Sequence, residues 1–119
     1  MQDSFAGYNG DHFTHNMWSD GVTMNQASPA VVQNNLFIDN SDINLILGSG
    51  TESDVSGNVV FELQNGAFGG VMFDNFNGNT DGNFQGMQFH NNVIDCNGRC
   101  DFGLELGPHP WQARSFLSY

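Results

Sequence analysis

The feature of this sequence that most constrains its fold is a six-residue pattern that returns four times along the chain. A large apolar residue is followed by two residues, an Asn or Asp, one further residue and a second apolar residue. The pattern occurs as Tyr8-Asp11-Phe13, Val32-Asn35-Phe37, Val55-Asn58-Val60 and Phe89-Asn92-Ile94. The Asn or Asp positions are 24, 23 and 34 residues apart. Self-similarity at such a period is typical of solenoids, in which each repeat is one small structural unit.

A second strand is expected eight to thirteen residues after each Asn or Asp, where apolar residues alternate with the period of a half-buried β-strand. The alternating residues are Val22 and Met24; Ile43, Leu45 and Leu47; Val71 and Phe73; Phe102, Leu104 and Leu106. A repeat of this size cannot bury its own apolar side, but stacked repeats can. We therefore predict about four stacked coils, with Asn35, Asn58 and Asn92 in one hydrogen-bonded column that Asp11 extends.

These repeats, from Tyr8 to Trp111, resemble the pectate-lyase-like superfamily of right-handed parallel β-helices. The resemblance implies an all-β fold, a right-handed parallel β-helix solenoid of about four coils in a single domain over residues 1–119. The excess residues of the 34-residue interval predict one long loop from the third coil, at residues 74–84. The superfamily contains extracellular polysaccharide lyases, glycoside hydrolases and epimerases, and also phage tailspikes and adhesins. It therefore implies a polysaccharide partner and an extracellular or cell-surface location.

Charge excludes several classes of partner. Thirteen acidic residues face only Arg99 and Arg114, for a formal net charge of -11. Two arginines cannot form the basic track that nucleic acid requires. No apolar run is long enough to span a membrane. The shortage of bases also disfavours a uronate lyase, because the lyases of this fold abstract a proton with Arg or Lys.

Hydrolysis of a glycosidic bond instead needs two carboxyl groups. If Leu45, Val71 and Leu104 face inward together, Asp74 and Glu105 lie on adjacent coils about 8 Å apart, and Asp42 and Asp101 lie about 10 Å apart. We expect Asp74 and Glu105 to be the catalytic pair. Asp42, Phe68, Met72, Asp101 and His109 are the expected substrate-binding residues. No metal site or cofactor is assigned, although Asp74, Asp81 and loop carbonyls offer oxygen ligands that suit calcium.

Three alternatives remain open from the sequence. The chain is either a polysaccharide-binding or polysaccharide-degrading module, or a non-catalytic structural segment of an adhesin or tailspike-like shaft. Cys96 and Cys100 either close a small disulfide loop or remain free thiols. Because no segment caps the first coil, we expect a fragment of a longer solenoid or an association, end to end or as a homo-oligomer, through the N-terminal end.

Overall fold

The computed structural model describes residues 1–73 and 81–106, and the structural statements below concern those residues. Eleven short strands and one helical turn follow one another along the chain. They are β1 (Phe5–Gly7), α1 (His12–His15), β2 (Val22–Met24), β3 (Val31–Gln33), β4 (Leu36–Ile38), β5 (Ile43–Leu47), β6 (Asp54–Ser56), β7 (Val59–Phe61), β8 (Ala67–Phe73), β9 (Gln88–His90), β10 (Val93–Asp95) and β11 (Cys100–Leu106). The described part of the chain is thus all-β apart from α1.

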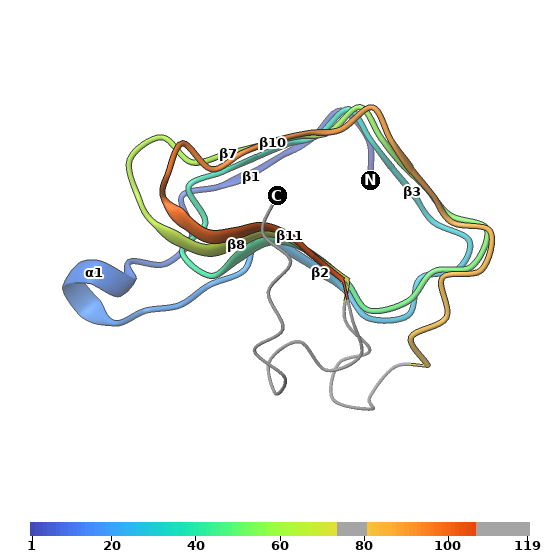
Figure 1. Ribbon diagram of the computed structural model, residues 1–119, viewed down its shortest axis with the longest axis horizontal. Helices are drawn as coiled ribbons and strands as arrows, with labels where there is room; N and C mark the ends of the chain where they lie inside the picture. Colours follow the sequence, from blue (N-terminus) through green and yellow to red (C-terminus); the bar gives the residue numbers. More distant parts are fainter. Residues whose placement is uncertain (74–80, 107–119) are drawn as a thin grey trace.

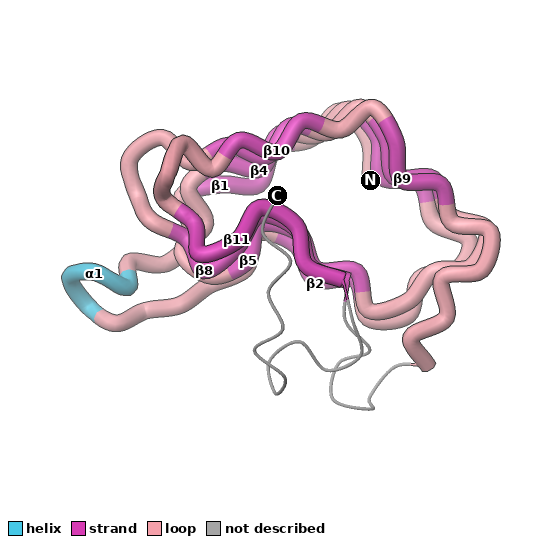
Figure 2. The backbone as a smooth tube through the Cα atoms, in the orientation of Figure 1, coloured by secondary structure: helices cyan, strands magenta, loops and turns pink. Residues whose placement is uncertain are grey.

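The strands form three parallel sheets. Their orders are β1-β4-β7-β10, β11-β8-β5-β2 and β3-β6-β9, so each sheet pairs strands from successive repeats. Seen down its shortest axis, the chain traces successive coils that lie on top of one another (Figure 1). Figure 2 shows the strands gathered along the sides of this outline, with loops at the corners. This arrangement is compatible with a β-solenoid.

The apolar residues of the repeats line one interior, as predicted. Val32 pairs with Val55, and Val55 with Phe89, across the third sheet. Leu45 pairs with Val71, and Val71 with Leu104, across the second. The buried members of both rows belong to one core cluster, which also contains Phe37, Leu47 and Val60. Each such side chain contributes about 1.5 to 3 kcal/mol by leaving water, so this shared interior is the main source of stability.

The asparagine column is also present as predicted. The side-chain Nδ2 of Asn35 donates to Oδ1 of Asn58 at 2.8 Å, and Nδ2 of Asn58 donates to Oδ1 of Asn92 at 2.9 Å. The backbone amides of Asn35 and Asn58 also donate to the asparagine of the next coil, each at 3.0 Å. The carbonyl of Val32 accepts a further bond from Asn58 at 2.8 Å. The column therefore satisfies backbone and side-chain groups at a buried corner, where an unpaired polar group would be costly.

The first coil differs from the prediction. Ser4, not Asp11, continues the asparagine column, because its backbone amide donates to Oδ1 of Asn35 at 3.1 Å. Asp11 instead lies in the long connection between β1 and β2, where it accepts bonds from the amide of Thr14 and the ring of His15. The prediction that Tyr8-Asp11-Phe13 marks the corner of the first coil, with Asp11 in the asparagine column, was therefore wrong. The connection that contains α1 lengthens this coil to 31 residues between Ser4 and Asn35.

Strict alternation also fails at the start of the second sheet. Ile43, Ile46, Met72 and Phe102 form a cluster of their own, separate from the interior core. Ile46 lies between Leu45 and Leu47, which face the interior, so this second cluster lies on the opposite face of the sheet. Strict alternation from an inward-facing Leu45 would place Asn44 on that outer face as well. It is instead fully buried and donates to Glu62, because two consecutive residues, Asn44 and Leu45, turn away from the outer cluster.

Candidate functional site

Three of the predicted site residues lie in one row at the start of the second sheet. Ile43 and Phe102 both pair with Gly69, so the residues before them, Asp42 and Asp101, flank Phe68 in the middle strand. The amide of Gly69 donates to the carbonyl of Asp42 at 3.0 Å, which holds this register. We call Asp42, Phe68 and Asp101 the acidic row. Its two aspartates are two strand spacings apart, or about 10 Å between backbones.

Phe68 is fixed in this row by the outer cluster. Its ring packs edge-on against Phe102 with ring centroids 5.3 Å apart and an interplanar angle of 88°. Gly69 leaves room for that contact, because a Cβ there would stand 2.2 Å from the Phe102 ring. The side chain of Phe68 remains partly exposed, as does that of Asp42, whereas Asp101 is exposed. The row is thus accessible from solvent and has a rigid aromatic ring at its centre.

The electrostatics of the acidic row come from Asp42 and its neighbour Asp20. Burial, and to a lesser extent the carboxylate of Asp20, together raise the pKa of Asp42 to about 6. Asp20 is held in place by Thr23, whose hydroxyl donates to Oδ2 at 2.7 Å, and by the amide of Ile43 at 3.4 Å. Asp42 is therefore a carboxyl that keeps its proton to higher pH than an ordinary aspartate.

The expected exposure of Glu105 and Met72 was wrong. These residues are paired in the register of β8 and β11, and only 1% and 0% of their surfaces are exposed. On the outer face of the second sheet, Met72 itself belongs to the apolar cluster with Ile43, Ile46 and Phe102. Asp74, His109 and Trp111 lie outside the described residues, and so does the expected spacing of Asp74 from Glu105.

A buried pair of carboxyl groups at another corner was missed from the sequence. Asp39 follows β4 and Glu62 follows β7, and neither side chain is exposed to solvent. Oδ1 of Asp39 accepts three bonds from the backbone amides of Leu63, Gln64 and Asn65, at 2.8, 2.9 and 3.2 Å. Oε1 of Glu62 accepts a bond from Asn44 at 2.5 Å. The sequence did contain a signal for this pair: Asp39 and Glu62 are 23 residues apart, the same interval that separates Asn35 from Asn58, so the repeat places them at the same corner of adjacent coils.

The second oxygens of these two groups bear on the protonation of Glu62. Oδ2 of Asp39 and Oε2 of Glu62 are buried and have no hydrogen-bond partner among the described residues. Burial is the largest of the effects that together raise the pKa of Glu62 to about 7; the Asp39 carboxyl group adds to the shift, and the Asn44 hydrogen bond and the charge of Arg99 oppose it. A proton on Glu62 satisfies both oxygens at once, because Oε2–H then donates to Asp39. Glu62, whose pKa is raised, is thus the member of the pair that holds a proton near neutral pH.

An asparagine chain connects this pair to the first coil. Asn9 donates to Asn40 at 2.8 Å, Asn40 donates to Asn44 at 2.7 Å, and Asn44 donates to Glu62. Asn40 and Asn44 are fully buried. A satisfied buried network of this kind holds a corner in one conformation. Because Asn40, Asn44 and Glu62 are buried, we assign this network a structural role.

Two further expectations concern cysteines and metals. Cys96 and Cys100 form a disulfide, which confirms the first of the two alternatives for these residues. Within residues 1–73 and 81–106, no group of three or more His, Cys, Asp or Glu side chains is arranged to hold a metal ion. Asp81, one of the suggested calcium ligands, is exposed and accepts a bond from the amide of Asn83. No helix in this part of the chain is long and apolar enough to cross a membrane.

In comparisons with known proteins, no family, no curated protein and no solved structure matches this chain. The chemistry of its own residues is therefore the ground for assigning it a function. Among the described residues, the acidic row combines an exposed carboxylate, a carboxyl of raised pKa and an accessible aromatic ring.

Proposed function

We propose that this chain is a right-handed parallel β-helix of the pectate-lyase-like type and that it binds a polysaccharide along the acidic row. The observation that carries the proposal is the register that sets Asp42 and Asp101 on either side of Phe68. Sugar sites combine a flat apolar surface with a few polar groups that fix orientation. Phe68 supplies the surface, and the two aspartates accept hydrogen bonds from hydroxyl groups.

The charge of the row selects the class of glycan. Asp42 and Asp101 flank Phe68 in register, and the carboxylate of Asp20 acts on Asp42, in a chain of formal net charge -11. A uronate polymer would bring further carboxylates against them without a basic side chain in the row to compensate. We therefore expect a neutral polysaccharide.

The same residues can carry out hydrolysis with inversion. Asp42, with its raised pKa, gives its proton to the glycosidic oxygen as the bond to the anomeric carbon breaks. Asp101, as carboxylate, takes a proton from the water that attacks that carbon from the opposite side. Carboxyl groups of inverting enzymes are roughly 6.5 to 9.5 Å apart, which is close to the backbone spacing of about 10 Å between Asp42 and Asp101.

One observation favours a second function. Glu105 and Met72, two residues expected to face a substrate, are buried, with only 1% and 0% of their surfaces exposed. This surface is therefore smaller than the sequence indicated, as expected for a non-catalytic segment of a longer shaft. The two proposals differ in whether the acidic row recognises a glycan.

Binding to a broad panel of neutral and uronate-containing polysaccharides, followed by analysis of products, tests the proposal. Asp42→Asn, Asp101→Asn and Phe68→Ala should each weaken binding to the same neutral glycan by about tenfold or more. If hydrolysis occurs, either Asn variant should abolish it, and turnover by the unaltered protein should fall as the pH rises through about 6.

The matched control is Asp3→Asn. Asp3 is exposed at another corner with a φ of 48°, a conformation that asparagine adopts at Asn34 in the next coil. This variant removes the same charge and should leave binding unchanged. A protein that binds no glycan in the panel, or that loses binding equally in Asp3→Asn, contradicts the proposal and favours a structural segment.

A further inference from the structure

The turn before β11 presents an exposed Asn-Gly pair. Asn97 and Gly98 have φ values of 49° and 69°, the positive values that a type I′ turn requires at its two central positions. The amide of Arg99 donates to the carbonyl of Cys96 at 2.7 Å and closes the turn, and the disulfide links Cys96 to Cys100 across it. Both central residues are exposed, and a Cβ added at Gly98 would meet nothing within 4 Å. The pair therefore lies in open space at the tip of a loop.

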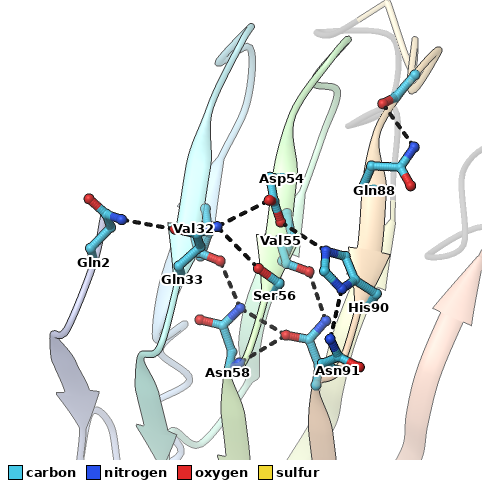
Figure 3. A network of polar contacts seen from close by, with 12 residues as sticks. Gln2, Val32, Gln33, Asp54, Val55, Ser56, Asn58, Gln88, His90 and Asn91 are labelled. Carbon is cyan, nitrogen blue, oxygen red and sulfur yellow. Dashed lines mark hydrogen bonds and ion pairs between the residues drawn. The ribbon is translucent and has the colours of Figure 1, made fainter.

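The side chain of Asn97 is not held by a neighbour. Its amide has no hydrogen-bond partner among the described residues, and only the backbone amide of Asn97 is bonded, to Oδ1 of Asp95 at 2.9 Å. Asn91 offers a direct comparison, because it is also exposed and has a φ of 55°. Its Nδ2, however, lies 3.0 Å from Nδ1 of His90 (Figure 3), and the residue that follows it is Asn92, not a glycine.

We propose that Asn97 is a modification site, at which the Asn-Gly pair converts spontaneously to aspartate and isoaspartate. The backbone nitrogen of Gly98 gives its proton to a base in solution and attacks Cγ of Asn97. A bond forms between these two atoms, the bond from Cγ to Nδ2 breaks, and Nδ2 leaves as ammonia with a proton from solvent. Water then opens the five-membered imide, at Cγ to give aspartate or at the backbone carbonyl carbon to give isoaspartate. The reaction needs only water and a base, and no atom is oxidised or reduced.

The turn gives this reaction little to overcome. The attacking nitrogen and Cγ belong to neighbouring residues, so the attack is intramolecular. Gly98 has no Cβ to crowd its nitrogen, and glycine rotates readily out of a turn conformation. The Asn97 side chain leaves no partner among the described residues, and opening the turn breaks one backbone bond, that of the Arg99 amide. The net worth of such a bond slows the reaction by about tenfold or less.

The fold protects the same dipeptide at two other places, Asn9-Gly10 and Asn65-Gly66. Nδ2 of Asn9 donates to Asn40 at 2.8 Å, within the asparagine chain that leads to Glu62. Gly66 is buried, and the amide of Asn65 donates to Asp39 at 3.2 Å. Reaction at either pair requires a corner of the solenoid to open, which costs far more than opening one exposed turn. A fourth pair, Asn77-Gly78, lies outside the described residues.

The fold should survive the modification. Isoaspartate adds one methylene group to the backbone, but the disulfide between Cys96 and Cys100 joins the two ends of the altered segment. The strand that follows, β11, is held independently by its pairing with β8. Either product adds one negative charge to a chain of formal net charge -11. The modified chain should therefore remain folded and accumulate as a more acidic form.

Incubation of the folded, oxidised chain at about pH 8, followed by peptide mass spectrometry, tests the proposal. The mass gain of amide-to-acid conversion should appear at Asn97 at least about tenfold faster than at Asn9 or Asn65. In the reduced chain unfolded in urea, these three asparagines should convert at similar rates. Asn91, which no glycine follows, should stay slow in both samples. The matched variant Asn97→Gln keeps the amide and the net charge but needs a six-membered imide, so it should convert at least about tenfold more slowly.

Two results would overturn the proposal. One is an Asn97 amide that converts no faster in the folded chain than those of Asn9 and Asn65. The other is conversion of Asn97 to aspartate alone, because direct hydrolysis of the side-chain amide bypasses the imide and cannot give isoaspartate. Fragmentation spectra of the peptide distinguish the two products. Urea unfolding of Asn97→Gln confirms that this variant folds, so a change in rate is not mistaken for unfolding.

Discussion

Replacement of Glu62 by Gln should stabilise this protein at alkaline pH and leave its stability almost unchanged in mild acid. The fully buried carboxyl has a pKa of about 7 in the folded protein, against an ordinary value of 4.5. Each pKa unit corresponds to about 1.4 kcal/mol, so ionisation of Glu62 removes at most about 3 kcal/mol from the free energy of unfolding. Glutamine is neutral at every pH, and its amide can still donate to Asp39 and accept from Asn44.

The direction follows from proton linkage. Because the folded pKa of Glu62 exceeds the unfolded value, the folded state holds a proton that the unfolded chain releases between pH 4.5 and about 7. The stability contributed by the protonated group is complete below pH 4.5 and is lost as the pH rises through about 7. Asp42, whose pKa is also raised, adds to the slope in the same direction but is unchanged in the variant.

Urea unfolding at about pH 5 and about pH 8, for the unaltered protein and Glu62→Gln, measures the effect as a difference between the two slopes. The control is Glu52→Gln, which removes an exposed carboxylate and should have little effect at either pH. If Glu62→Gln is less stable than the unaltered protein at about pH 8, or keeps the same pH dependence, the reasoning about the buried pair is refuted.

Three other predictions concern the corners and the packing. Asn58→Ala leaves buried hydrogen-bond partners in two other coils unpaired and should lower the free energy of unfolding by about 3 kcal/mol or more in urea. Asn34 is exposed, so the control variant Asn34→Gly should change that free energy by less than about 0.5 kcal/mol in the same assay. Joint replacement of Cys96 and Cys100 by Ser should cost about 2 kcal/mol, and titration of the unfolded, unreduced protein should find no free thiol. Gly70→Ala should strongly lower the stability measured in thermal melts, because a Cβ at position 70 would lie 2.5 Å from the Gly103 carbonyl oxygen and 2.7 Å from Ile94. In Gly98→Ala the new Cβ meets nothing within 4 Å, so this variant should lose only about 1 to 2 kcal/mol from backbone strain. Equal losses in the two variants would contradict the packing around Gly70.

Much of the interior could be predicted from the sequence because the repeat carries it. Where apolar and asparagine residues return at the same interval, as at Val32 and Val55 or Asn35 and Asn58, periodicity alone sets the register. The first coil broke this rule because the connection that contains α1 interrupts the interval. Asp11 matched the sequence pattern, but Ser4 occupies the corresponding place in the asparagine column.

The candidate site was only partly predictable, for a different reason. The alignment of Asp42, Phe68 and Asp101 follows from register and is present in the structure. The burial of Glu105 does not follow from register, because exposure depends on what covers the outer face of a sheet. Asp39 and Glu62 were missed because a carboxyl group at a corner is expected to be exposed to water, and the sequence does not show the amide groups that donate to it in the fold. Periodicity therefore predicts which residues are neighbours, and tertiary packing decides which of them meet solvent.

The most direct test of stacked coils is a nuclear Overhauser measurement on the side-chain amides of Asn35, Asn58 and Asn92. We expect contacts from Asn58 to both of the other asparagines, together with slow exchange of its Nδ2 protons, because that group is buried between Val32 and Asn92. Asparagine side chains that exchange rapidly and show no contacts to one another would contradict the column, and with it the shared interior on which the fold and the acidic row depend.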